Sequence, residues 1–115
     1  MEGEFCKLRE IILLKKIYGF YLYVDEAHSI GALGETGRGI TEQLNCSFDD
    51  IDILMGTFSK SFASSGGYIA SDHKTISLLR SNAYGYVYGN PISPGFAQQI
   101  YSRLELINSS VGMAK

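Results

Sequence analysis

The sequence predicts an α/β fold, and two observations carry that prediction. Apolar residues recur at helical spacing near both ends of the chain. Between them lie two short segments that lack this spacing: 20–24, which is apolar throughout, and 51–56, which is apolar except for Asp52. A polar group follows each run at once: Asp25 ends the first and Thr57–Lys60 end the second. Strands and helices that follow one another in this order pack as layers around a largely parallel sheet.

The first two elements predicted are a helix over 7–18 and a strand over 20–24. Leu8, Ile11 and Ile12 mark one face of the helix, and Gly19 is placed to end it in a left-handed conformation. The run that follows is apolar without alternation and rich in aromatic residues. This pattern is typical of a strand that is buried on both faces of a sheet.

The middle of the chain is predicted to hold a turn-rich loop over 31–39, a short helix over 40–45 and two strands. The loop contains several glycines but lacks the lysine and hydroxyl that end a phosphate-binding loop. The strands cover 51–56 and 66–70. The nine residues between them are too few for a helical crossover, so an antiparallel pair is expected.

Three elements are predicted for the C-terminal third. Asp72 is expected to cap a helix that runs through Ile76, Leu79 and Arg80. Tyr84–Tyr88 is predicted as a further strand. A last helix is predicted from Pro94 to about Ile107, because apolar residues recur there at helical spacing.

Composition restricts the classes of partner and compartment. The 115 residues suffice for one small domain, and a net charge of −2 gives no indication of nucleic-acid binding. No apolar run is long enough to span a bilayer. Cys6 and Cys46 lack metal-ligand spacing and are interpreted as ordinary thiols of an intracellular protein.

The polar groups after the two runs are candidate functional residues, because open α/β sheets bind ligands at the carboxyl ends of their strands. Asp25 is either a turn residue or a carboxylate that binds a cation or a protonated ring nitrogen. His28, three residues on, is placed to reach the same crevice. Lys60 is either a solvated loop residue or an amine that forms a Schiff base, and hydroxyls such as Thr57 beside it suit a phosphate.

Three functions remain open at this point. The first is an enzyme that uses pyridoxal 5′-phosphate (PLP), with Lys60 on the cofactor and Asp25 on its ring nitrogen. The second is a helicase-type ATPase, because residues 25–28 spell Asp-Glu-Ala-His, although no phosphate-cradling motif accompanies them. The third is a non-catalytic interaction module.

Four segments at matching order and spacing resemble the α-oxoamine synthases, which are PLP enzymes of the aspartate aminotransferase fold. The segments are 24–34, 37–39, 56–62 and 66–69. Within that family, the residues of these segments are most similar to those of the catalytic subunit of the serine palmitoyltransferases. The resemblance implies that residues 1–115 form part of the large, PLP-binding domain of a fold-type-I transferase. It also implies that the N-terminal part of that domain and the small C-terminal domain lie outside this chain.

The resemblance also implies roles for matching residues. Lys60 matches the Schiff-base lysine, which also moves protons, and Asp25 matches the partner of the pyridine nitrogen. His28 matches the histidine near the phenolic oxygen of the cofactor, and Thr57 matches a hydroxyl on the phosphate side.

The activity implied is the decarboxylating condensation of L-serine with a long-chain acyl-CoA to 3-ketosphinganine, in sphingolipid biosynthesis. Another α-oxoamine synthase, acting on glycine or alanine, is the alternative. The implied partner is a homologous subunit, in a homodimer or heterodimer. The implied location is the cytosolic face of the endoplasmic reticulum membrane.

The chain departs from the family pattern at two places. Ala63 stands where the family has glycine, and Gly89-Asn90-Pro91 stands where it has a small residue followed by Thr and Ser. Pro91 has neither the N–H nor the hydroxyl that would hold a phosphate, so a weaker phosphate contact is expected there. With part of the pocket outside the chain, we expect the isolated chain to be inactive.

Overall fold

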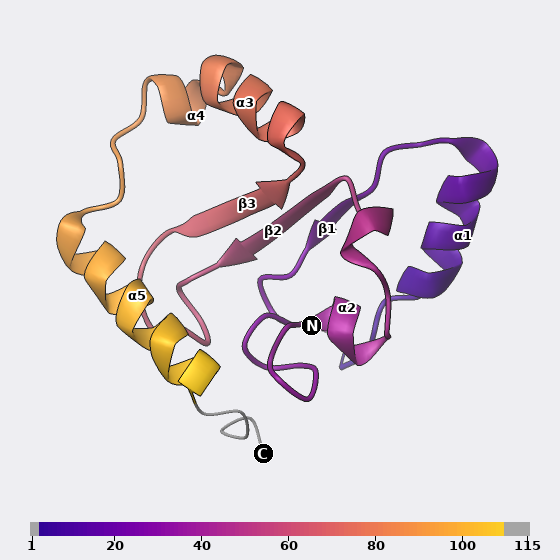
Figure 1. Cartoon of the computed structure of the whole chain (residues 1–115), viewed down its shortest axis with the longest axis horizontal. Helices are drawn as coiled ribbons and strands as arrows, with labels where there is room; N and C mark the ends of the chain where they lie inside the picture. The colour runs from indigo at the N-terminus through magenta and orange to yellow at the C-terminus, as the bar shows by residue number, and fades with distance from the viewer. Residues whose placement is uncertain (1–2, 110–115) are drawn as a thin grey trace.

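The computed structural model describes residues 3–109 and is centred on a three-stranded sheet (Figure 1). The strands are β1 (Tyr23–Asp25), β2 (Ile53–Thr57) and β3 (Gly67–Ser71), in the order β1-β2-β3. β1 pairs with β2 in parallel, and β2 pairs with β3 antiparallel. The α/β class and the antiparallel pair are therefore confirmed.

Helices lie around this sheet. Figure 1 shows α1 and α2 to one side of it, α3 and α4 beyond the end of β3, and α5 at the opposite side. Among the described residues, no helix combines the length and the apolar character that crossing a membrane requires. The helices are α1 (Leu8–Tyr18), α2 (Ile40–Gln43), the 3₁₀ helix η1 (Phe48–Asp50), α3 (His73–Asn82), α4 (Tyr84–Val87) and α5 (Pro94–Ser109).

Local chemistry sets the helix ends where the sequence predicted it. Gly19 ends α1 with φ 69° and ψ 31°, and its N–H donates to Lys15 O. This left-handed conformation suits glycine, which has no Cβ. Asp72 precedes α3, and its side chain accepts hydrogen bonds from the N–H groups of Lys74 and Thr75. Both predicted caps are confirmed.

The hydrophobic core lies between α1, α2 and one face of the sheet. An ion pair closes one end of this layer, because Lys15 Nζ lies 2.6 Å from Asp52 Oδ2. The same carboxylate accepts the Leu22 N–H at 2.6 Å, so it ties α1, the approach to β1 and the start of β2 together. The buried core residues are Leu8, Ile12, Val24, Ile40 and Leu54.

Two predictions about strands are wrong. Residues 84–87 form the short helix α4 and not a strand, and the rings of Tyr84 and Tyr88, four residues apart, lie 5.0 Å apart. The run 20–24 is not buried on both faces, because β1 is an edge strand of the described sheet and only its Val24 side packs against α1. Tyr21 is 90% exposed and Tyr23 is 54% exposed.

Candidate functional site

The two segments that carry the candidate residues leave the sheet at the same edge. β1 and β2 are parallel neighbours, with Asp25 opposite Met55 in the register. Just past β1, the Glu26 N–H donates to Met55 O at 2.7 Å. The turn that carries Asp25 and His28 is therefore fixed beside the strand that leads to Lys60, as expected for parallel strands.

The turn over 25–31 alternates between exposed and buried side chains. Asp25 and His28 are exposed, whereas Glu26 is 0% and Ser29 8% exposed. Asp25 Oδ1 accepts the Ala27 N–H at 2.8 Å. This single bond holds one oxygen of the carboxylate and leaves Asp25 oriented at the end of β1.

The loop over 58–66 presents Lys60 outward by burying a phenylalanine two residues on. Phe62 is 3% exposed, and its ring meets that of Phe58 edge to face at 5.6 Å. The Ala63 N–H donates to Lys60 O at 2.9 Å, and the Ser64 N–H donates to Phe58 O at 2.8 Å. Since Phe62 anchors the loop, the exposed Lys60 projects from a fixed base.

Gly31 lets the two segments come into contact. It has φ +75°, and a Cβ added there would meet Ser61 Cβ at 2.6 Å. Any larger residue at position 31 would push the neighbour of Lys60 away from the turn that carries His28. The absence of a side chain is therefore part of the site's construction.

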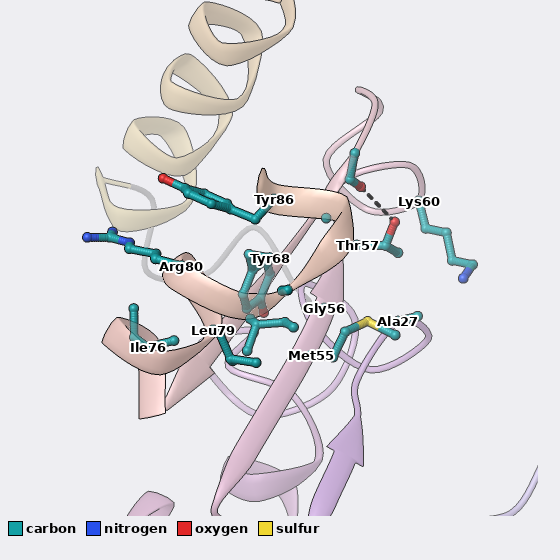
Figure 2. A pocket seen from close by; sticks show the side chains of 14 residues that line it. Ala27, Met55, Gly56, Thr57, Lys60, Tyr68, Ile76, Leu79, Arg80 and Tyr86 are labelled. Carbon is teal, nitrogen blue, oxygen red and sulfur yellow. Dashed lines mark hydrogen bonds between the residues drawn. The ribbon is translucent and has the colours of Figure 1, made fainter. Parts of the chain in front are cut away.

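A cavity of about 810 Å³ lies at one end of these segments (Figure 2). Figure 2 shows Thr57 and Lys60 next to each other at one side, near Ala27 and Met55, with Ile76 and Arg80 at the other. Asp25 and His28 flank Ala27 in the sequence but are not among the lining residues. The structure thus brings Thr57 and Lys60 into one cavity and leaves Asp25 and His28 outside its lining.

The Thr57 hydroxyl is held at the mouth of this cavity. Its Oγ1 donates to Gly66 O at 3.0 Å, accepts the Ser59 N–H at 3.2 Å, and lies 2.8 Å from Ser59 Oγ. Two hydroxyls and a backbone N–H therefore gather between β2 and Lys60. Groups of this kind bind phosphate oxygens when their hydrogens are free, whereas here the Thr57 hydroxyl and the Ser59 N–H donate within the chain.

The burial of Glu26 is incompatible with the ATPase interpretation. In an Asp-Glu-Ala-His motif the glutamate must reach Mg²⁺ and water, yet this side chain is 0% exposed and points into the protein. Burial raises the pKa of its carboxyl, and the hydrogen bond from Ser29 partly offsets that rise. Among the described residues, no group of three or more His, Cys, Asp or Glu side chains is arranged to hold a metal ion.

Three residues of the site region were not found from the sequence. Arg80 and Tyr86 line the cavity from α3 and α4. Tyr68 lies opposite Gly56 in the register, and its ring fills the space that a Cβ of Gly56 would need. Burial raises the pKa of the Tyr68 hydroxyl, and the Glu26 carboxylate raises it further. The only signal in the sequence was the glycine at position 56, which marks a close approach within a strand.

The two departures from the family pattern occupy distinct places. Ala63 has φ 47°, in the left-handed region, where glycine carries no steric penalty. Asn90 and Pro91 are not among the residues that line the Lys60 cavity. They border a second cavity, of about 740 Å³, with Phe58, Gly66 and α5.

Among curated proteins, serine palmitoyltransferases are similar to this chain in sequence. The chain is 52% identical over 112 residues to serine palmitoyltransferase 2 of Caenorhabditis elegans, covering 97% of the chain and 20% of that protein. It is 51% identical over 107 residues to serine palmitoyltransferase 3 of Homo sapiens, covering 93% and 19%. The chain thus spans about a fifth of the length of these curated relatives.

Solved structures show the same relationship. A serine palmitoyltransferase from Sphingomonas wittichii superposes with a TM-score of 0.84 at 33% identity, covering 93% of this chain and 27% of that one. A serine palmitoyltransferase solved with a PLP internal aldimine gives 0.83 at 30% identity, covering 91% and 26%. The 8-amino-7-oxononanoate synthase of Francisella tularensis gives 0.76 at 28% identity, covering 91% and 30%.

The resemblance seen in the sequence is thus confirmed by relatives and by fold. The profile of the family described as aminotransferase class I and II matches residues 2–113, which is nearly the whole chain. This chain belongs to the aminotransferase class I and II family.

Proposed function

We propose that this chain supplies part of the PLP site in the large domain of a decarboxylating acyltransferase that joins L-serine to a long-chain acyl-CoA. The observation that carries the proposal is the placement of Asp25 and the Lys60 loop at the carboxyl ends of adjacent parallel strands. The serine palmitoyltransferases among the relatives supply the substrate class.

The residues present suit PLP in their chemistry. An exposed amine at Lys60 suits an aldehyde, and the Asp25 carboxylate suits a protonated pyridine nitrogen. The hydroxyls of Thr57 and Ser59 suit a phosphate. Each of these groups stands on a segment whose backbone is fixed to β1 or β2.

In this proposal PLP, when bound, accepts the electrons released at Cα of the amino acid. Lys60 holds the cofactor through its amine and moves a proton at Cα. Asp25 would keep a proton on the ring nitrogen, and His28 would lie near the ring oxygen. Thr57 binds the phosphate.

The overall reaction balances as L-serine plus acyl-CoA giving 3-ketosphinganine, CO₂ and CoA. The bond from Cα to the carboxylate and the thioester C–S bond break, and a bond from Cα to the acyl carbonyl carbon forms. The proton removed from Cα is replaced there, and one proton is taken up from solvent by the CoA thiolate. A homologous subunit as partner, and the cytosolic face of the endoplasmic reticulum membrane as location, are parts of the same proposal.

The test uses a full-length chimaera in which this chain replaces the matching segment of the Caenorhabditis elegans serine palmitoyltransferase 2. The chimaera is incubated with PLP, reduced with borohydride and mapped by peptide mass spectrometry. We expect the cofactor on Lys60. Label on another lysine, or on none, would refute the proposal, and ATP hydrolysis that is lost in Glu26→Gln would support the ATPase instead.

The replacement Ala63→Gly is expected to stabilise the Lys60 loop in this chimaera. A non-glycine residue in the left-handed region destabilises the folded state by about 1–2 kcal/mol. Replacement by glycine removes this strain, but the larger conformational entropy of glycine in the unfolded chain offsets about 0.5–1 kcal/mol of the gain. A net gain of about 0.5–1 kcal/mol corresponds to an increase of about 2- to 5-fold in hydrogen-exchange protection of residues 58–66.

The matched control for Ala63→Gly is Ala97→Gly, which lies inside α5. The same substitution in a helix interior destabilises by about 1 kcal/mol, so protection of α5 should fall. If Ala63→Gly lowers the protection of its own loop, the backbone at position 63 is not strained as described.

A further inference from the structure

The turn over 25–31 has an inward side that the proposed function does not use. Asp25 and His28 point outward, and the residues between and after them, Glu26 and Ser29, are buried. A buried carboxyl one residue from the proposed partner of the ring nitrogen is a group whose contacts fix that partner's position.

Glu26 forms hydrogen bonds both to β2 and to the later residues of its own turn. Its N–H donates to Met55 O on β2 at 2.7 Å, and its carbonyl accepts the N–H groups of Ser29 and Ile30, each at 3.0 Å. The side chain of Glu26 also contacts Ser29, because Ser29 Oγ donates a hydrogen bond to Glu26 Oε2 at 3.2 Å. The segment between these contacts is Ala27-His28, so the bonds of Glu26 determine where His28 emerges.

The carboxyl also contacts the segment that leads into α2. A Cβ at Gly39 would overlap Glu26 Oε2, so the carboxyl lies directly against the backbone there. Thr41, in the first turn of α2, is fully buried. On the sheet side, Tyr68 is the titratable neighbour that the Glu26 charge affects. Glu26 therefore joins the turn, β2 and α2.

This arrangement is not favourable for stability alone. Glu26 Oε1 makes no hydrogen bond of good geometry among the described residues, and the burial of the carboxyl outweighs the bonding groups of Ser29, Thr41 and Ile40 near it, so that its pKa is raised. A buried group that opposes folding and fixes a site residue is typical of a functional role.

We propose that Glu26 is the positioning residue of the cofactor-binding turn: it fixes Asp25 and His28 relative to the Lys60 loop. It acts through the turn and not by touching the cofactor or substrate. This inference rests on the proposed function, since it concerns the same site.

The test measures PLP binding to the full-length apo-chimaera and the pH dependence of the absorbance of the bound cofactor. Glu26→Ala is expected to weaken PLP binding by about 5- to 10-fold, which is the loss of about one hydrogen bond's contribution. It should also shift the pH at which the absorbance changes, because Asp25 no longer lies in its place beside the ring nitrogen. Glu26→Gln keeps the shape and one acceptor, so it should recover part of the affinity.

Glu26→Gln and a further variant, Ser29→Ala, keep the test decisive if Glu26→Ala does not fold. Ser29→Ala removes the bond to Oε2 alone and should weaken binding in the same direction. Its effect should not add to that of Glu26→Gln, because both act on one contact. The matched control is Glu35→Gln, an exposed glutamate in the adjacent glycine-rich loop, for which no change is expected.

The outcomes separate this inference from the proposed function. Unchanged PLP affinity and an unchanged pH profile in Glu26→Gln and Ser29→Ala would overturn the positioning role, while borohydride labelling of Lys60 would still uphold the site. No labelling of Lys60 in the unaltered chimaera would overturn both.

Discussion

Replacing Lys60 with alanine is expected to abolish formation of 3-ketosphinganine in the full-length chimaera. In the proposed function, the variant loses the amine that would hold the cofactor and the base that would move the proton at Cα. Loss of the proton transfer alone reduces the rate by about 10²- to 10⁴-fold, and loss of covalent catalysis adds to it. The measurement is turnover with L-serine and a long-chain acyl-CoA, together with borohydride labelling.

Lys74→Ala is the matched control for this prediction. Lys74 is an exposed lysine near the start of α3 and does not line the Lys60 cavity. Its removal should leave turnover and labelling unchanged. Turnover in Lys60→Ala within about 10-fold of the unaltered chimaera would show that another residue performs the proton transfer.

The sequence predicts α1 and α3 well because one end of each helix depends on local chemistry. Gly19 and Asp72 each act within a few residues, so their effects are visible without knowledge of the fold. The antiparallel pair of β2 and β3 is predictable for the same reason, since a short connection excludes a crossover.

The strand predictions that are wrong depend on packing partners that lie far away in the sequence. Whether the run 20–24 is buried depends on what covers β1, and in the described structure only one face is covered. Aromatic residues at 84–88 fit a strand by propensity, yet they pair along one side of a short helix. Propensity for strands mainly measures such packing, so the sequence alone does not decide it.

The sequence predicted candidate residues only on the outward side of the site. Asp25, His28, Thr57 and Lys60 were proposed because polar groups at strand ends stand out against apolar runs, and their roles stay predictions. Glu26 stood in the same motif and was given a role only in the ATPase alternative, although it lies two residues after the buried Val24 and so on the same face of the chain. Its contacts with Ser29 and Gly39 require the fold, because α2 and the loop before it must close over the turn.

Replacing Gly39 with alanine is expected to be the most destabilising single change in this part of the chain. Gly39 has φ 86° and ψ −160°, a conformation that is essentially restricted to glycine, at about 1–3 kcal/mol for other residues. The new methyl group would also overlap Glu26 Oε2, and overpacking adds about 1–3 kcal/mol. We expect a total loss of stability of about 2–6 kcal/mol, measured as lost hydrogen-exchange protection of residues 25–44 in the chimaera.

Gly19→Ala separates the two causes, because Gly19 also has a positive φ but a Cβ there would meet nothing within 4 Å. Gly19→Ala should lower the free energy of unfolding by about 1 kcal/mol, because only the left-handed backbone conformation opposes the new side chain. The double variant Gly39→Ala with Glu26→Ala should recover the overlap term, which gives a coupling energy of about 1–3 kcal/mol between the two positions. A coupling near zero, or equal effects of the two glycine variants, would mean that the Glu26 carboxyl does not lie against position 39. The inferred contact between the turn and α2 would then be wrong, and with it the proposed positioning of Asp25 and His28.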